Sequence, residues 1–153
     1  YTSAVDAAKK VEGAKVIGVD VDQAGVIANY AAGEGADEAT IEGYKALTVT
    51  SAMKGLYPAT FDTLTDVIVN GNWEKYSAKI DTLGLVSADD PTANYVQIPM
   101  ESTQWADGKF TQDDYKALVK AMFDGTLTVS NDITKAAKDF ATVIAVDDQG
   151  NIK

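Results

Sequence analysis

The 153-residue sequence contains neither cysteine nor histidine. The absence of cysteine excludes disulfides, thiolate metal sites and cysteine nucleophiles. The absence of histidine removes the commonest general base and the commonest zinc ligand. Any catalysis by this chain must therefore depend on carboxylates, lysine, hydroxyl groups or a bound cation.

Positive charge is also scarce. Thirteen basic residues stand against 23 acidic ones, which gives a net charge of -10. A surface of this sign repels a phosphate backbone and an anionic membrane, so we expect no nucleic-acid partner. Long apolar runs are missing too, because no stretch approaches the ~20 residues of a membrane-spanning helix. A hydrophobic content of 46% over this length is enough for one buried core, and we expect one domain.

The sequence begins at Tyr1 without a signal segment, inside a stretch whose apolar spacing predicts a helix over residues 2–12 that ends at Gly13. A strand over residues 15–19 follows after a short loop. These elements are typical of the second half of a βαβ unit whose first strand is missing. We therefore interpret the sequence as the carboxyl-terminal part of a longer chain.

The most informative stretch is VIGVDVDQAG, residues 16–25. Its apolar, β-branched start predicts a buried strand, which places Asp20 and Asp22 at the carboxyl end of that strand. Ligands bind at this end of the strands in open α/β sheets. Residues i and i+2 of a strand point the same way, so the two carboxylates suit a cation, the hydroxyl groups of a polyol, or the capping of the following turn.

The rest of the chain predicts an alternation of helices and short strands. The glycine-rich and acidic stretch 20–43 predicts a loop insertion with a turn of helix. Helical spacing then predicts a long helix that starts at the N-cap Ser51, kinks at Pro58 and ends at Gly71. Another helix is expected to begin after the capping hydroxyl of Thr111. Short strands are expected at 46–50, 78–84, 95–98, 127–129 and from residue 142 onward, with a short helix at 132–140.

One interpretation of the polar residues is enzymatic. A strand that ends in Asp-x-Asp, a strand that ends in Thr-Ser, a lysine and a later Asp-Asp pair resemble the general pattern of the haloacid-dehalogenase-like phosphatases. That resemblance implies a magnesium counter-ion and gives each residue a role: nucleophile for Asp20, general acid/base for Asp22, phosphate contact for Thr50 or Ser51, and charge clamp for Lys54. The later pair would be Asp89 with Asp90, or Asp147 with Asp148. The Gln-Ala-Gly at 23–25 departs from the Gly-Thr of that family.

A second resemblance covers more of the chain. The stretches IGVDVDQ, TVTSAMKGLYPAT, VNGNW and FDGTLTV occur in order between Tyr1 and Val129. Together they closely resemble the carboxyl-terminal part of the basic membrane protein family, the purine nucleoside receptor A-like substrate-binding lipoproteins of ABC importers. IGVDVDQ combined with TSAMK matches both sides of the aspartates and is far more specific than a bare Asp-x-Asp.

This second resemblance implies an α/β architecture of the type I periplasmic-binding-protein-like kind, a Rossmann-like three-layer fold in two lobes. Residues 1–47 would belong to the second lobe, 51–72 would form a helix that crosses to the first lobe, and 76–153 would be the return segment and tail. The acidic insertion at 31–43 lengthens the gap between the aspartates and the lysine relative to that family. The tail after Asn131 has no counterpart that we match.

The function that this resemblance implies is binding without catalysis, with no cofactor and no metal. The ligand would be a nucleoside, a purine by the resemblance, which is held between two lobes outside the cell and passed to an ABC permease. Asp20 would accept hydrogen bonds from ribose hydroxyl groups, and Lys54 would reach the same sugar from the facing helix. Asp22, Gln23 and Ser51 are the further candidate ligand-binding residues.

The resemblance also implies a location and a partner. An amino-terminal lipid would anchor the full-length precursor to the cell membrane, on the extracytoplasmic side. Because the first lobe is absent from this sequence, we expect apolar surface that either a companion lobe or another copy of the chain covers.

Overall fold

The computed structural model describes residues 1–141, 143–148 and 150. It is a mixed α/β structure with one small sheet of three strands in the order β1-β2-β3. In chain order the elements are α1 (Thr2–Ala8), β1 (Val16–Asp20), α2 (Ala24–Ala32), α3 (Glu38–Lys45), β2 (Thr48–Lys54), α4 (Leu56–Leu64), the π-helical turn η1 (Thr65–Val69), α5 (Trp73–Tyr76), the 3-10 turn η2 (Pro91–Ala93), β3 (Val96–Gln97), α6 (Gln112–Phe123) and the 3-10 turn η3 (Ala137–Asp139).

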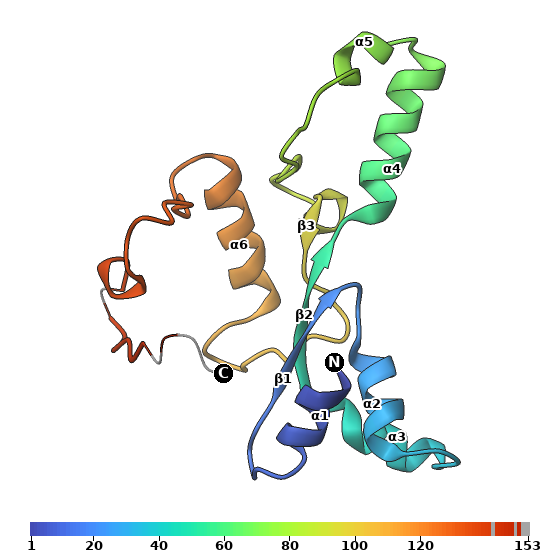
Figure 1. The fold of residues 1–153 in the computed structure, drawn as a ribbon, viewed down its shortest axis with the longest axis vertical. Helices are drawn as coiled ribbons and strands as arrows, with labels where there is room; N and C mark the ends of the chain where they lie inside the picture. The colour runs from blue at the N-terminus through green and yellow to red at the C-terminus, as the bar shows by residue number, and fades with distance from the viewer. Residues whose placement is uncertain (142, 149, 151–153) are drawn as a thin grey trace.

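The sheet is built on a parallel pair. β1 and β2 run parallel and are joined through α2 and α3, whereas β3 pairs with the end of β2 in the antiparallel direction. Figure 1 shows α1, α2 and α3 gathered around the start of this pair, while α4 and α5 extend beyond its other end. Within the described ranges no helix has both the length and the apolar character that a bilayer crossing needs.

The buried core is small and lies where the first three helices meet the parallel strands. Val5, Ile27 and Ala31 form its centre, and all three side chains are at most 1% exposed. Val16, Tyr44 and Leu47 pack around them from β1, from α3 and from the approach to β2. The core therefore joins α1 and α2 to one side of the parallel pair.

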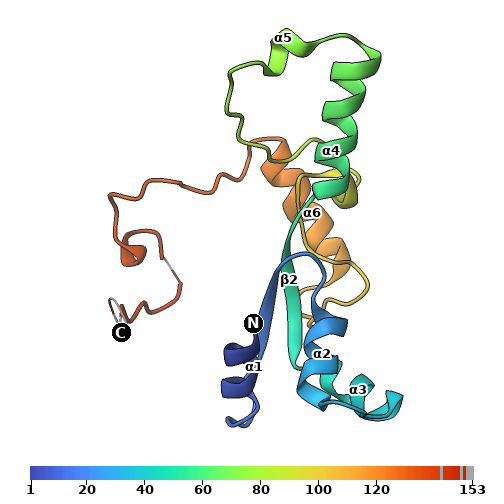
Figure 2. The ribbon, with the colours of Figure 1, turned by 45° about the vertical axis from the view of Figure 1, so that its right-hand side comes forward.

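Much apolar surface lies outside this core. Ile17 and Val19 of β1 are 67% and 54% exposed, while Gly18 between them is buried, so one face of β1 is bare. The accessible surface of the chain is 11227 Å². A folded monomer of this mass is expected to expose roughly 7,500 Å². The arrangement in Figure 2, in which α4 and α5 extend beyond the sheet and the segment after α6 leads away from it, is consistent with this excess.

The strand predicted at 15–19 and the helix predicted after Thr111 are confirmed as β1 and α6. Thr111 accepts a hydrogen bond from the Asp114 amide, and the Asp114 carboxylate accepts one from the Thr111 amide in return, which forms a complete capping box. The helix predicted at 2–12 is shorter, because α1 ends at Ala8, although Gly13 does have a positive φ of 76°.

The loop predicted for residues 20–43 is wrong, because the stretch folds into α2 and most of α3. The buried side chains of α2 are Ala24, Ile27, Ala28 and Ala31, which follow helical spacing but consist mainly of alanine. Such a face gives a weak hydrophobic signal. The N-cap of α3 is Asp37, whose carboxylate accepts a hydrogen bond from the Thr40 amide.

The predicted start of the next helix is also wrong. Ser51 lies inside β2 rather than at an N-cap, and the N-cap of α4 is Gly55, four residues later. Pro58 consequently falls in the first turn of α4, where its missing amide hydrogen has no intrahelical partner to lose and no kink is required. The segment predicted as one helix over 51–72 is thus a strand end, a helix and a π-helical turn.

Several short strands do not form in the described part of the chain. The stretches 78–84 and 127–129 are irregular, and the strand predicted at 95–98 is reduced to β3. Of the helix predicted at 132–140 only η3 forms, and residues 143–148 and 150 of the predicted terminal strand are not in a strand, with the rest of it outside the described residues. Alternation of side chains makes a strand only where a neighbouring strand supplies hydrogen bonds, and among the described residues no strand is paired with 78–84, 127–129 or 143–148.

We predict that Ile27→Ala destabilises the chain by about 2–4 kcal/mol, because it removes the largest buried side chain of a small core and leaves a cavity. Chemical unfolding followed by circular dichroism measures this. Val26→Ala is the matched control, since Val26 lies next to Ile27 on the same helix and is 50% exposed. Equal effects of the two substitutions would contradict the core as described.

Candidate functional site

Asp20 and Lys54, the two residues predicted to share a ligand, are in contact. The parallel register places Asp20 opposite Met53, one residue before Lys54, at the ends of β1 and β2. Lys54 Nζ lies 2.7 Å from Asp20 Oδ1, and the side chains of the lysine and the aspartate are 67% and 53% exposed. The inserted stretch between them folds into helices that return the chain, so its length does not keep the pair apart. Lys54 itself is the last residue of a strand, whereas the sequence had predicted it on a helix.

The backbone at Asp20 is unusual. Its φ is 70°, a left-handed value that is rare outside glycine, although aspartate tolerates it better than most residues. The Val21 amide donates a hydrogen bond of 2.9 Å to the Val19 carbonyl, which closes a γ-turn centred on Asp20. A γ-turn with positive φ is the rarer and strained kind. This turn ends β1 and directs the Asp20 carboxylate toward Lys54.

The γ-turn overturns the expectation that Asp20 and Asp22 point the same way, since regular strand alternation stops at Asp20. Asp22 instead lies one residue before Gln23, the N-cap of the following helix, and its Oδ1 accepts a hydrogen bond of 3.1 Å from the Ala24 amide at the start of α2. A carboxylate at a helix N-terminus is favoured by the exposed amides and by the helix dipole. Asp22 therefore shapes the β1–α2 loop.

Gln23 and Ser51 tie the same loop to the sheet. Gln23 Oε1 accepts a hydrogen bond of 3.0 Å from the Val19 amide, and the Gln23 amide donates one of 3.1 Å to Ser51 Oγ. Ser51 is fully buried, so its hydroxyl lies beneath the loop rather than at its surface. A Cβ on Gly18 would come within 2.9 Å of Gln23 Cβ and even closer to Ser51 Oγ, so only glycine fits there.

A shallow hollow lies beside the ion pair. It has a volume of about 370 Å³, and its wall combines polar and apolar side chains. Lys54 contributes its charge, Thr92 and Gln97 contribute a hydroxyl and an amide, and Val21 and Tyr57 are among the apolar neighbours. This mixture suits a small ligand with one polar and one flat apolar part.

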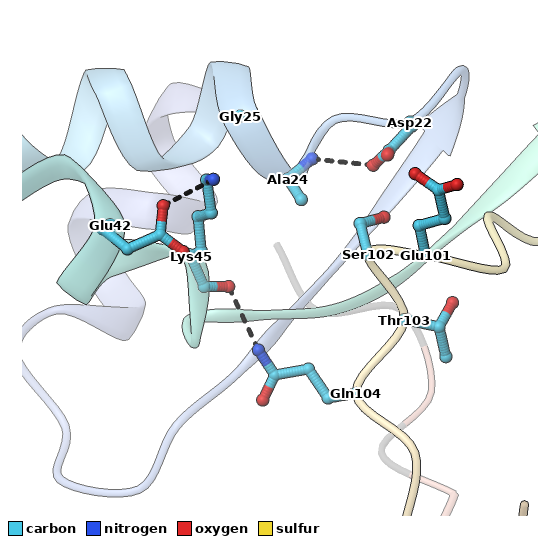
Figure 3. A pocket seen from close by; sticks show the side chains of 9 residues that line it. All are labelled: Asp22, Ala24, Gly25, Glu42, Lys45, Glu101, Ser102, Thr103 and Gln104. Carbon is cyan, nitrogen blue, oxygen red and sulfur yellow. Dashed lines mark hydrogen bonds and ion pairs between the residues drawn. The ribbon is translucent and has the colours of Figure 1, made fainter. Parts of the chain in front are cut away.

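A larger hollow, of about 560 Å³, lies on another side of the β1–α2 loop and contains neither Asp20 nor Lys54. In the view of Figure 3, Asp22 and Glu101 lie on one side of it, and Glu42 and Lys45 face each other on the other side. Glu42 and Lys45 form an ion pair of 2.5 Å, and the Asp22 carboxylate is bonded to the helix start. The acidic groups of this hollow are thus largely engaged within the protein.

The remaining wall of the larger hollow is the segment 101–104, which the sequence did not predict as part of any site. Gln104 Nε2 donates to the Lys45 carbonyl, and Thr103 Oγ1 lies 2.8 Å from Thr50 Oγ1. These contacts bring residues from beyond β3 against the start of β2. No local sequence pattern marks them, because their position depends on the return of the chain along β2.

The side chains that the phosphatase resemblance assigns have other partners. Thr50 is bonded to Thr103, Ser51 to the Gln23 amide, and Asp22 to the start of α2. In residues 1–141, 143–148 and 150 no group of three or more acidic side chains is placed to hold a metal ion. The residues present do not fit a magnesium site beside Asp20.

Comparison of the chain with protein-family models, with curated proteins and with solved structures finds no match. Five residues predicted from the sequence, Asp20, Asp22, Gln23, Ser51 and Lys54, lie around one loop; the first and last of them face outward, and the other three hold the loop.

We predict that Gly18→Ala destabilises the fold by about 1–3 kcal/mol, because the added methyl group meets Ser51 and Gln23 in a packed layer. Gly43→Ala is the matched control. Gly43 lies within α3 with open space around it, so alanine there should stabilise the helix by about 0.5–1 kcal/mol. Chemical unfolding of both variants measures the difference, and the same sign for both would contradict the close packing at Gly18.

We predict that Asp20→Asn changes the free energy of unfolding by less than about 1 kcal/mol, because the ion pair with Lys54 is more than half exposed and asparagine also tolerates a positive φ. The same unfolding experiment tests this. A decrease in the free energy of unfolding well above 2 kcal/mol would show that the ion pair stabilises the fold rather than being available to a ligand.

Proposed function

We propose that this chain is part of an extracytoplasmic substrate-binding protein of an ABC importer and that it binds a nucleoside without chemical turnover. The observation that carries the proposal is the contact between Asp20 and Lys54 at 2.7 Å. The sequence resemblance to the basic membrane protein family pairs these two residues on one ribose. Their meeting at the carboxyl ends of two parallel strands supports that pairing.

The chemistry of the pair suits a vicinal diol. Lys54 engages one carboxylate oxygen of Asp20, which leaves the other oxygen to accept a hydroxyl proton and the lysine to donate to a hydroxyl oxygen. Both side chains are largely exposed, so a ligand can reach them without rearrangement of the core. Neither group needs to change its charge for this recognition.

The neighbouring hollow supports a ligand larger than a free sugar. With the ribose on the ion pair, the rest of a nucleoside would extend along Gln97, Thr92 and the ring of Tyr57. Tyr57 is 77% exposed, so its ring is available for stacking with a base. In the proposed two-lobed protein of type I periplasmic-binding-protein-like fold, a facing lobe closes over this open side and passes the ligand to the permease. The proposal includes an amino-terminal lipid that anchors the full-length precursor to the cell membrane.

We predict that the chain binds guanosine, inosine or adenosine more tightly than ribose and that Asp20→Asn weakens this binding at least 10-fold, because the amide loses one acceptor and its charge. Isothermal titration calorimetry measures both. Asp113→Asn is the matched control, since Asp113 is an exposed aspartate of α6 whose contact with Lys116 is long, at 3.5 Å.

Other outcomes would overturn parts of the proposal. If ribose gives a heat of binding and the nucleosides do not, the ion pair is still a binding site for a diol, but the ligand is not a nucleoside. Magnesium-dependent release of phosphate from a simple phosphate ester, abolished in Asp20→Asn, would replace binding by phosphatase activity. Equal affinity of the wild type and of Asp20→Asn for the nucleoside would show that the ion pair is not part of the binding site.

A further inference from the structure

The hollow beside Lys54 is lined by two polar residues whose hydrogen-bond donors are already used, and the first is Thr92. Its hydroxyl donates a hydrogen bond of 2.6 Å to Asp90 Oδ1, and its amide donates one of 2.9 Å to the same oxygen. These bonds hold the pKa of the Asp90 carboxyl below its usual value, so the group is ionised at neutral pH and can only accept. Thr92 Oγ1 can therefore offer a ligand only its lone pairs.

The second residue is Gln97, which lies opposite Met53 in the antiparallel pair of β2 and β3. Its Nε2 donates hydrogen bonds to two backbone carbonyl groups, those of Thr92 and Asn94. A carbonyl oxygen cannot donate, so these bonds fix which end of the amide is the nitrogen, and they use both of its N–H groups. The atom that remains for a ligand is Oε1, which is an acceptor.

The backbone beside these side chains adds no donor along residues 92–94. All three amides of this segment are bonded to Asp90 or to the Pro91 carbonyl. Among residues 1–141, 143–148 and 150, no donor is bonded to Thr92 Oγ1 or to Gln97 Oε1. We refer to these two oxygens as the acceptor edge of the hollow.

The segment that carries the acceptor edge is held by Asn94, whose side chain is fully buried. Asn94 Oδ1 accepts hydrogen bonds of 2.6 Å and 2.8 Å from the amides of Val86 and Ser87, and its Nδ2 donates one of 3.1 Å to the Ser87 carbonyl. The Asn94 carbonyl is itself one of the acceptors of Gln97. Rotation of the Gln97 amide would set its oxygen against two carbonyl oxygens, so the polarity of the edge does not adapt to the ligand.

The Lys54 end of the hollow has the opposite polarity. Its ammonium group has three donors and no acceptor. A ligand that spans the hollow therefore meets a donor at one end and two acceptors along the edge.

We propose that the acceptor edge selects nucleosides whose base carries an N–H donor. This selection rests on the proposed function, in which the ribose lies on the ion pair and the base extends along Thr92 and Gln97. Adenosine has an exocyclic amino group, inosine has a ring N–H, and guanosine has both. Purine riboside has the same sugar and the same ring system but no donor on its base. Such a base would displace water from two acceptor oxygens and return no hydrogen bond to them.

The test is isothermal titration calorimetry of the 153-residue chain with adenosine and with purine riboside. We expect purine riboside to bind at least about 5-fold more weakly than adenosine, which corresponds to one hydrogen bond in a partly exposed site. The two ligands share the ribose, so the ion pair contributes equally to both. A third ligand, 6-methoxypurine riboside, has a substituent that accepts but does not donate, and it should bind no more tightly than purine riboside.

Variants of the acceptor edge test which oxygens are responsible. Thr92→Val and Gln97→Met each remove one oxygen, and each should lower the ratio of the affinity for adenosine to that for purine riboside. The double variant should bind both ligands with equal affinity. A change that only disturbs the loop weakens both ligands alike and leaves this ratio unchanged, so the ratio separates recognition of the base from a structural role.

The chain offers a matched control for each substitution. The hydroxyl and the amide of Thr134 both donate to Asp132 Oδ1, which repeats the turn at Thr92 outside the hollow. Gln112 Nε2 donates to the Met100 carbonyl and also lies outside the hollow. Thr134→Val and Gln112→Met should leave the affinity ratio at the wild-type value.

Three results would overturn the proposal. Equal affinity of the wild type for adenosine and purine riboside, with both weakened by Asp20→Asn, would remove the selection by the acceptor edge and leave the proposed function intact. A ratio that persists in the double variant would show that other groups recognise the base. Absence of binding by every nucleoside would overturn the proposed function and this selection together.

Discussion

The parallel pairing of β1 with β2 is the interaction on which the rest of the structure depends. It brings Asp20 against Lys54, places Ser51 beneath the β1–α2 loop, and provides the face on which α2 packs. It also fixes where β2 ends and therefore where α4 leaves the sheet. Without this pairing the predicted site residues would not lie close to one another.

The pairing tolerates little variation at its centre. Gly18 of β1 lies opposite Ser51 of β2, and the Gln23 side chain closes over both. Any side chain at Gly18 would push the loop away from the strands. The strained turn at Asp20 is held from both sides by these contacts, and a conformation that costs on the order of 1–3 kcal/mol persists only with such support.

Apolar burial is distributed unevenly in this chain. The core around Ile27 is closed, whereas the bare face of β1 and the side chains of Tyr57, Phe61 and Leu64 on α4 remain open. Burial at either open surface adds hydrophobic free energy, so anything that binds there stabilises the folded state by mass action.

The sequence by itself determined the elements whose signals are local. The apolar run before Asp20 predicted β1, and the Thr111 hydroxyl with an acidic first turn predicted α6. The motifs also singled out Asp20 and Lys54. These signals act within a few residues of the chain, so no knowledge of the neighbours was needed to recognise them.

Only the tertiary structure decided which residues form strands and what each polar group does. Ser51 carries the signal of a helix cap, yet it lies in a strand because β1 offers it hydrogen bonds. The alternating stretch 78–84 carries the signal of a strand, yet it forms none because no strand lies beside it among the described residues. Asp20 and Asp22 carry the same local signal, but the γ-turn at Asp20 separates their roles. Asp20 forms an ion pair with Lys54, and Asp22 accepts a hydrogen bond from the start of α2. Strand pairing and side-chain partners depend on residues far apart in the chain, and their register is a property of the assembled fold.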